Sequence, residues 1–183
     1  LAAPARAQGP SPVAAENALP GDGGWQLTHR AGPGQLEAYA GAASVNHGEA
    51  VDVHVRADRP GTVRWDLYRM GWYGGAQGRR LLSGGPVPVG PQPTPAPTST
   101  GRLECAWPTT FTVATGADWT SGVFLLVLRR DDGVETYAIF VVRADERKGA
   151  AVVQTSVTTW QAYNAWGGKS LYVGGPAAEV SFD

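Results

Sequence analysis

The chain has 183 residues, enough for one ordinary domain with a fragment or for one large β domain. Its formal net charge of -1 gives no electrostatic footprint for a polyanion, so nucleic acid is not an expected partner. No apolar run approaches the roughly 18 residues of a membrane span, and a single cysteine, Cys105, excludes an internal disulfide and a multi-cysteine zinc site. We expect Cys105 to be a small buried hydrophobe.

The first 18 residues are rich in Ala, Pro and Gly and are expected to be flexible, because they contain too little bulk to bury. Within residues 1–7, Ala5-Arg6-Ala7 fits the small-x-small pattern that signal peptidase accepts. The segment is therefore interpreted either as the remnant of a secretory signal or as a disordered leader. The first interpretation predicts a secreted, periplasmic or cell-surface protein.

Strand signals recur over residues 19–143, and the 25 glycines and 14 prolines favour β structure with many turns. The expected strands cover residues 36–40, 51–57, 62–68, 109–114, 123–129 and 137–142. In the second of these, Val51, Val53 and Val55 alternate with polar residues and should face a core. Arg130-Asp-Asp-Gly133 predicts a hairpin turn.

Six prolines within residues 84–101 argue against regular sheet pairing in that stretch. Elsewhere, seven or so antiparallel strands over about 120 residues predict an immunoglobulin-like β-sandwich. The fold class is therefore expected to be mainly β, with the sandwich followed by a different kind of domain.

Residues 144–183 predict the first strand and helix of an incomplete α/β domain. The apolar run 150–153 is typical of a buried strand, and Thr158 or Thr159 is the expected N-cap of a helix over residues 160–166. One strand and one helix cannot cover their own apolar faces. We expect a second polypeptide, a part of the same precursor removed by cleavage, or the face of the sandwich to complete this unit.

Common catalytic patterns are not evident in the sequence. His29, His47 and His54 fall in expected loops or on the outer face of a strand, without a Gly-x-Ser-x-Gly motif, and are interpreted as surface residues. Gly167-Gly-Lys-Ser170 resembles the end of a phosphate loop, but Tyr163 occupies the position of the required glycine. Lys169 is instead expected near the carbonyl end of the helix, where a cation is favoured.

Two aromatic groups are candidate binding elements. Trp72 and Tyr73, in the glycine-framed loop 70–79, either stack on a sugar or another planar ligand, or pack against a neighbouring domain. Trp160, Tyr163 and Trp166 are spaced to form an aromatic stripe on one side of the helix. The phenolate of Tyr163 is a hard, anionic donor suited to ferric iron, although such a stripe also suits a core.

Several motifs resemble the N,N-dimethylformamidase large-subunit-like family. They are Met70-Gly-Trp-Tyr-Gly-Gly75, Trp119-x-Ser-Gly-Val-Phe124, the strand at 137–143, and Thr155-Ser-Val-Thr-Thr-Trp-Gln-Ala-Tyr-Asn-Ala-Trp-Gly-Gly-Lys-Ser-Leu-Tyr172. The resemblance implies a β-sandwich before an α/β domain of glutamine-amidotransferase-like architecture. It also implies hydrolysis of a small amide at a single iron bound by two tyrosines and a glutamate.

The resemblance places Tyr163 at the first tyrosine ligand, whereas the other two ligands belong to a portion beyond residue 183. The leading hypothesis is thus the amino-terminal fragment or subunit of a secreted, iron-dependent amidohydrolase for linear amides, completed by a second chain. Its expected pocket residues are Trp160, Asn164, Trp166, Lys169 and Tyr172; the catalytic residues are not identified. The alternative is a non-catalytic β-sandwich module that binds a glycan, a partner protein or a surface assembly.

Overall fold

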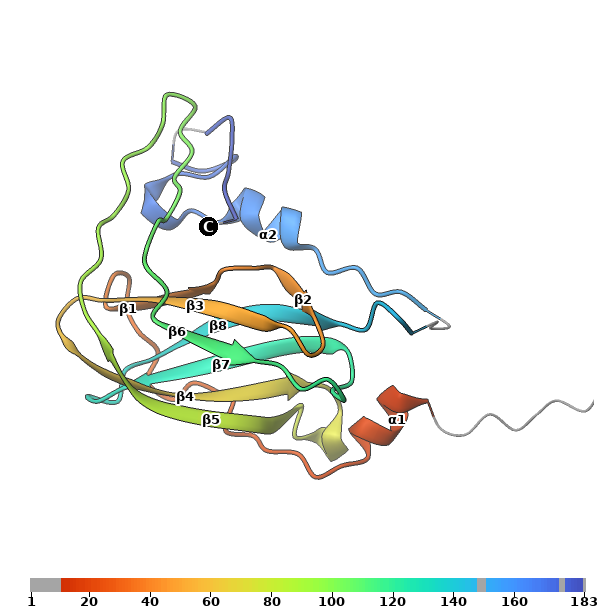
Figure 1. The fold of residues 1–183 in the computed structure, drawn as a ribbon. Coiled ribbons are helices and arrows are strands. Elements are labelled where there is room, and N and C mark those ends of the chain that lie inside the picture. Colours follow the sequence, from red (N-terminus) through yellow and green to blue (C-terminus); the bar gives the residue numbers. More distant parts are fainter. Residues whose placement is uncertain (1–10, 148–150, 175–176, 183) are drawn as a thin grey trace, which may run out of the picture.

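The computed structural model describes residues 11–147, 151–174 and 177–182. Its strands are β1 (Leu36–Ala40), β2 (Ser44–Asn46), β3 (Ala50–Ala57), β4 (Gly61–Met70), β5 (Gly78–Val89), β6 (Phe111–Ala114), β7 (Gly122–Arg130) and β8 (Glu135–Arg143). Its helices are α1 (Pro12–Asn17) and α2 (Val157–Tyr163), with 3-10 turns η1 (Tyr73–Gly75) and η2 (Trp166–Gly168). A three-stranded sheet, β1-β3-β6, packs on a five-stranded sheet, β2-β8-β7-β4-β5 (Figure 1). The prediction of a mainly β protein is confirmed.

The alternating pattern of β3 accounts for its place in the sandwich. Val51, Val53 and Val55 are buried, while Asp52 between them is exposed. Successive side chains of a strand point to opposite faces, so the three valines enter the space between the sheets. The predicted turn between β7 and β8 also forms, with Gly133 N–H donating to the Arg130 carbonyl at 2.8 Å.

The core lies between the two sheets and is centred on β7. Phe124, which is 0% exposed, stacks on Trp119 at a centroid distance of 5.4 Å and on Phe140 at 5.8 Å. Leu126 and Leu128 follow it on the same face of β7 and are also fully buried. These residues share one apolar core with the buried valines of β3, and this core joins the two sheets.

Two details of the sandwich differ from the prediction. β2 runs parallel to β8, with Ser44 opposite Val141. Although β2 follows β1 in the chain, it belongs to the other sheet and therefore does not form a hairpin with β1. The prolines of residues 84–89 do not prevent pairing, since Pro88 lies opposite Thr62 in the β4–β5 ladder. An edge strand tolerates proline because the missing N–H need not serve a second neighbour.

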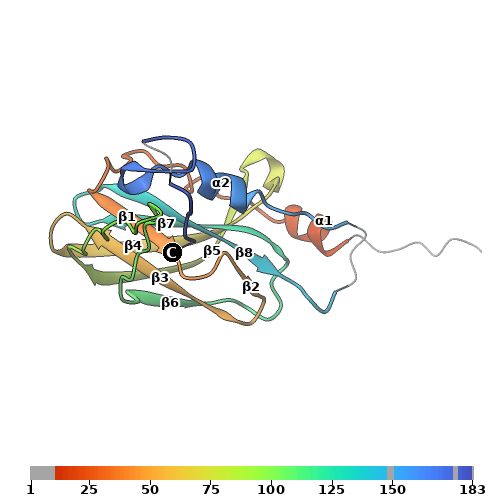
Figure 2. The same cartoon turned by 90° about the horizontal axis from the view of Figure 1, so that it is seen from above.

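Residues 12–17, which we expected to belong to a flexible leader, form α1 instead. Ser11 caps this helix, its Oγ accepting from Ala14 N–H at 3.2 Å, and proline occupies the first helical position. α1 lies at one end of the sandwich beside η1 (Figure 1 and Figure 2). The signal-remnant interpretation concerns residues 1–7, which lie outside the described residues.

Tyr73 holds α1 in place. Its side chain is 3% exposed, and its hydroxyl donates to Glu16 Oε1 at 2.9 Å and accepts from Arg69 Nη1 at 2.8 Å. Burial raises the pKa of Tyr73 above its ordinary value, so the phenol keeps the proton that it donates.

We expect Tyr73→Phe to lower the free energy of unfolding by about 1–2 kcal/mol, because the buried Arg69 and the half-buried Glu16 each lose a hydrogen-bond partner. Amide exchange in α1 should accelerate as its anchor weakens. Urea denaturation and hydrogen–deuterium exchange measure the two effects. Trp72→Ala, which removes a side chain that is 68% exposed, serves as the neighbouring control. Unchanged exchange in α1 of the Tyr73 variant would contradict the anchoring role.

The expected strand at 150–153 is wrong for residues 151–153, which are irregular; position 150 lies outside the described residues. Val152 and Val153 are 96% and 88% exposed. β8 already pairs with β2 on one side and β7 on the other, so the sheet offers this apolar run no free edge beside β8.

The helix also differs from its expected limits. α2 begins at Val157, after Ser156, and ends at Tyr163, whereas Trp166 lies in η2. Asn164 ends the helix in an extended conformation, and its side-chain oxygen accepts from Trp166 N–H at 3.1 Å. Asparagine side chains compete with the backbone for such hydrogen bonds, which explains the early end. None of the described helices is long and apolar enough to cross a membrane.

Candidate functional site

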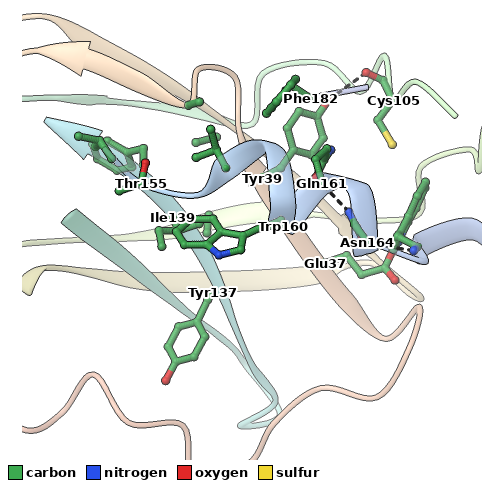
Figure 3. Close-up of a pocket in the computed structure, with 18 of the residues that line it drawn as sticks. Glu37, Tyr39, Cys105, Tyr137, Ile139, Thr155, Trp160, Gln161, Asn164 and Phe182 are labelled. Atoms are coloured by element: carbon green, nitrogen blue, oxygen red, sulfur yellow. Dashed lines mark hydrogen bonds between the residues drawn. The ribbon is translucent and has the colours of Figure 1, made fainter. Parts of the chain in front are cut away.

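A cavity of about 350 Å³ lies beneath α2, where β1 of the three-stranded sheet meets β8 of the five-stranded sheet (Figure 3). Its size is at the lower end of the roughly 300–1,000 Å³ that small-molecule sites occupy. Most of the lining comes from these two strands, from the loop that contains Trp107, and from the segment that includes α2.

The strands supply one wall through their alternating side chains. On β8, the partly exposed Tyr137 and Ile139 line the cavity, and the neighbouring Phe140, which is 1% exposed, borders it from the core. On β1, Tyr39 lines the cavity and stacks on His54 at a ring-centroid distance of 4.6 Å. His54, which we interpreted as a solvated surface residue, is half-buried, and its ring Nδ1 is bonded to the Trp107 carbonyl at 2.8 Å.

The loop before β6 supplies a second wall that the sequence did not reveal. Trp107 is 5% exposed, and its indole Nε1–H donates to the Pro93 carbonyl at 2.9 Å. Its ring centroid lies 5.5 Å from that of Tyr39 and 5.9 Å from that of Trp166, with the two tryptophan rings in a T-shaped arrangement. Cys105, two residues earlier, is buried as predicted.

The segment from α2 onward covers the cavity. Trp160, Gln161 and Asn164 line it from the helix (Figure 3). The segment is held by its own later residues, since Gln161 Nε2 donates to the Ser181 carbonyl. It is also held by the proline-rich loop, because Ala178 N–H donates to the Thr100 carbonyl at 2.8 Å.

The predicted site residues fall into two groups. Trp160, Asn164 and Trp166 line the cavity, and Lys169 lines a smaller neighbouring cavity of about 40 Å³. Tyr163 and Tyr172 belong to neither lining: they stack on each other at 4.6 Å and are 61% and 63% exposed. The structure therefore separates the proposed iron ligand from the cavity wall.

The loop of Trp72 and Tyr73 lies at the α1 end of the molecule, away from α2 (Figure 1). Trp72 is 68% exposed, whereas Tyr73 is buried against Arg69 and Glu16. Only the indole of Trp72 is therefore accessible to a ligand or a partner.

The described residues bring together no cluster of the acidic, histidine or cysteine side chains that commonly bind metals. Among them, no group of three His, Cys, Asp or Glu side chains could hold a metal ion. Tyr163 has the donor chemistry that ferric iron accepts, and its exposed ring leaves the hydroxyl within reach of groups from outside.

Comparisons with known proteins were made for sequence and structure. No curated protein matches the chain. The solved structures that resemble it include the sporulation control protein Spo0M from Bacillus subtilis, with 13% identity over 62% of this chain and 50% of that chain and a TM-score of 0.33. Another is superoxide reductase (neelaredoxin) from Ignicoccus hospitalis, with 12% identity over 62% and 82% of the two chains and a TM-score of 0.34.

This chain spans half the length of the Spo0M chain, and both structural similarities are too weak to inform function. The family model described as N,N-dimethylformamidase beta subunit-like, C-terminal, matches residues 64–182. The match begins in β4, includes α2 with Tyr163, and extends over more than half of the chain. The chain therefore belongs to the N,N-dimethylformamidase beta subunit-like family, which confirms the resemblance seen in its motifs.

Proposed function

We propose that this chain is one part of a secreted, iron-dependent protein that hydrolyses linear amides. In this proposal Tyr163 gives one phenolate ligand to the iron, and a second polypeptide completes both the ligand set and the α/β domain. The observation that carries the proposal is the position of Tyr163. Its phenol is 61% exposed on a helix within the family match, so an external group can approach it.

The surface around this helix supports a companion chain. The exposed large apolar residues of this region are Val152, Val153, Trp160, Tyr163, Tyr172, Val173 and Phe182. Seven exposed apolar residues within one segment of 31 residues favour contact of this segment with a partner. An obligate partner of this kind would bury more than roughly 2,000 Å².

The chemistry that iron supplies when bound is Lewis-acid polarisation of the amide carbonyl and acidification of a water molecule. The contribution of this chain is to position the donor. The Tyr172 ring stacks on the Tyr163 ring and restricts its rotation, so the phenol is held in one orientation outside the cavity lining.

Tyr163→Phe tests the ligand assignment. We expect the purified complex to lose its iron, because its affinity for iron should fall at least about tenfold. Substitution of residues that merely hydrogen-bond to metal ligands already has effects of that size. The phenolate-to-iron charge-transfer absorption of the complex should disappear. Tyr172→Phe, which removes the hydroxyl of the stacked neighbour, should keep both. Full iron occupancy in the Tyr163 variant would contradict the assignment of Tyr163 as an iron ligand.

A non-catalytic binding module is the second candidate, and the exposed indole of Trp72 favours it. Native mass spectrometry of the purified material separates the two. A complex that dissociates into this chain and a companion, with loss of iron, supports the hydrolase. A lone, metal-free chain of 19.2 kDa supports the binding module and directs attention to Trp72.

A further inference from the structure

We propose that the cavity beneath α2 binds a neutral, planar heterocycle that carries an adjacent N–H and C=O, as a lactam does. This site goes beyond the proposed function, because Tyr163 does not line the cavity. Trp160 and Asn164 do line it, and their i, i+4 spacing puts them on one face of the helical turn, whereas Tyr163 contacts Tyr172 outside.

The cavity walls select a flat ligand. Trp107, Trp160, Trp166 and Tyr39 all contribute aromatic rings to the lining. Two of them are fixed before any ligand enters: Trp107 donates to the Pro93 carbonyl at 2.9 Å, and Tyr39 donates to the Cys105 carbonyl at 3.2 Å. Rings held in this way offer stacking and edge contacts at little cost in side-chain entropy.

The electrostatics select a neutral ligand. Among the described residues that line the cavity, Glu37 alone is charged. Its carboxylate accepts from Gly34 N–H at 2.9 Å and pairs with Arg56 at 3.4 Å. An anion that entered would find no cationic side chain among the described lining residues, and a cation would have to compete with Arg56 for the one carboxylate, so an ion gains little there to offset its lost hydration.

Two carboxamides select the polar groups of the ligand. Gln161 Nε2 donates to the Ser181 carbonyl, and Asn164 Oδ1 accepts from Trp166 N–H at 3.1 Å. Gln161 Oε1 and Asn164 Nδ2 then face each other at 3.5 Å, at the outer limit of a hydrogen bond. This adjacent acceptor and donor matches the N–H and C=O of a cyclic amide, which would replace one weak contact with two good ones.

Isothermal titration calorimetry of the full chain tests the ligand class. The probes are 2-quinolone, a neutral bicyclic lactam; quinoline, the same ring system without the lactam; and the 2-naphthoate anion. We expect saturable binding of 2-quinolone, about tenfold weaker binding of quinoline, as expected for the loss of one or two hydrogen bonds, and no binding of 2-naphthoate. Equal affinity for all three probes, or no saturable binding of 2-quinolone up to its solubility limit, would overturn the proposal.

Variants locate the binding. Trp160→Ala removes an aromatic wall, and Ile139→Trp fills the cavity from an outward position on β8 that is 44% exposed, so the core is left intact. Both should weaken 2-quinolone binding about tenfold or more, whereas Trp72→Ala, at the far end of the sandwich, should not. Circular dichroism verifies that each variant is folded. Unchanged affinity in both cavity variants would place the ligand elsewhere and refute the site. Tyr163→Phe should bind 2-quinolone normally, because Tyr163 does not line the cavity. The iron proposal and the cavity proposal can therefore fail independently of each other.

Discussion

Phe124→Ala is expected to lower the free energy of unfolding by about 3–5 kcal/mol, the cost of removing a large aromatic ring from a packed core. Phe124 is 0% exposed and stacks on Trp119 and Phe140, which come from a loop and from β8. The substitution therefore leaves a void between the sheets that rigid neighbouring strands cannot close. The loss is measured by urea denaturation as a lower transition midpoint at an unchanged slope.

Phe182→Ala is the matched control for this prediction. Phe182 is 52% exposed, so its removal should change the free energy of unfolding by no more than about 0.5 kcal/mol. Equal losses in the two variants would contradict the assignment of Phe124 as the centre of the core.

Glu135→Ala is expected to lower the free energy of unfolding by about 1–3 kcal/mol, because backbone and side-chain donors of three residues lose the carboxylate that accepts from them. Glu135, at the start of β8, is 5% exposed. Its Oε2 accepts from Thr28 N–H at 2.6 Å and from His29 N–H at 3.0 Å, and its Oε1 accepts from Arg129 Nε at 2.8 Å. The carboxylate therefore fastens the segment before β1 to the five-stranded sheet.

The same residue predicts a pH dependence. Burial alone would raise the pKa of Glu135, but the hydrogen bonds from His29, Thr28 and Arg129 outweigh burial and hold the pKa below its ordinary value of 4.5. The unfolded chain thus takes up a proton at higher pH than the folded chain. The stabilisation is complete above pH 4.5 and is lost as the pH falls through the folded-state pKa.

Urea denaturation at a series of pH values from neutral to acid checks both effects. Glu135→Gln keeps the shape and one acceptor oxygen, so it should lose less stability than the alanine variant and show a flatter fall in acid. Glu104→Ala removes an exposed carboxylate that pairs with Arg102 at 3.2 Å, and should change stability by about 1 kcal/mol or less. An acid profile of Glu135→Gln identical to that of the original chain would contradict the role of the carboxylate.

The fold was predictable wherever the local pattern agreed with the final packing. The alternation in β3 and the apolar run in β7 are local signals of burial, and both strands formed as expected. β5 and the run at 151–153 were not predictable, because their outcomes depend on which sheet edge is free. Pro88 can lie in a strand because β5 is at the edge of its sheet. Val152 cannot join the same sheet beside β8, because β8 already has a neighbour on each side.

The candidate site was predictable only in the part that lies within one motif. Trp160, Asn164 and Trp166 were selected from a single stretch of sequence, and all three line the cavity. Trp107 and Tyr39 complete the walls from segments more than fifty residues distant, and nothing in the local sequence of either indicates the other. The stripe of aromatic residues also did not reveal that the helix ends at Tyr163, whose ring stacks on Tyr172 and does not line the cavity.

The proline-bearing edge of the larger sheet affects how the molecule behaves at high concentration. β5 forms one border of this sheet and contains Pro86 and Pro88, while the opposite border is the three-residue strand β2. A strand from a second molecule could not pair fully with β5, because the prolines lack N–H donors. It could not pair stably with β2, because β2 has only three residues. Both borders of the five-stranded sheet therefore resist the edge-to-edge growth that leads to fibrils, without a lysine or a covering helix to block it.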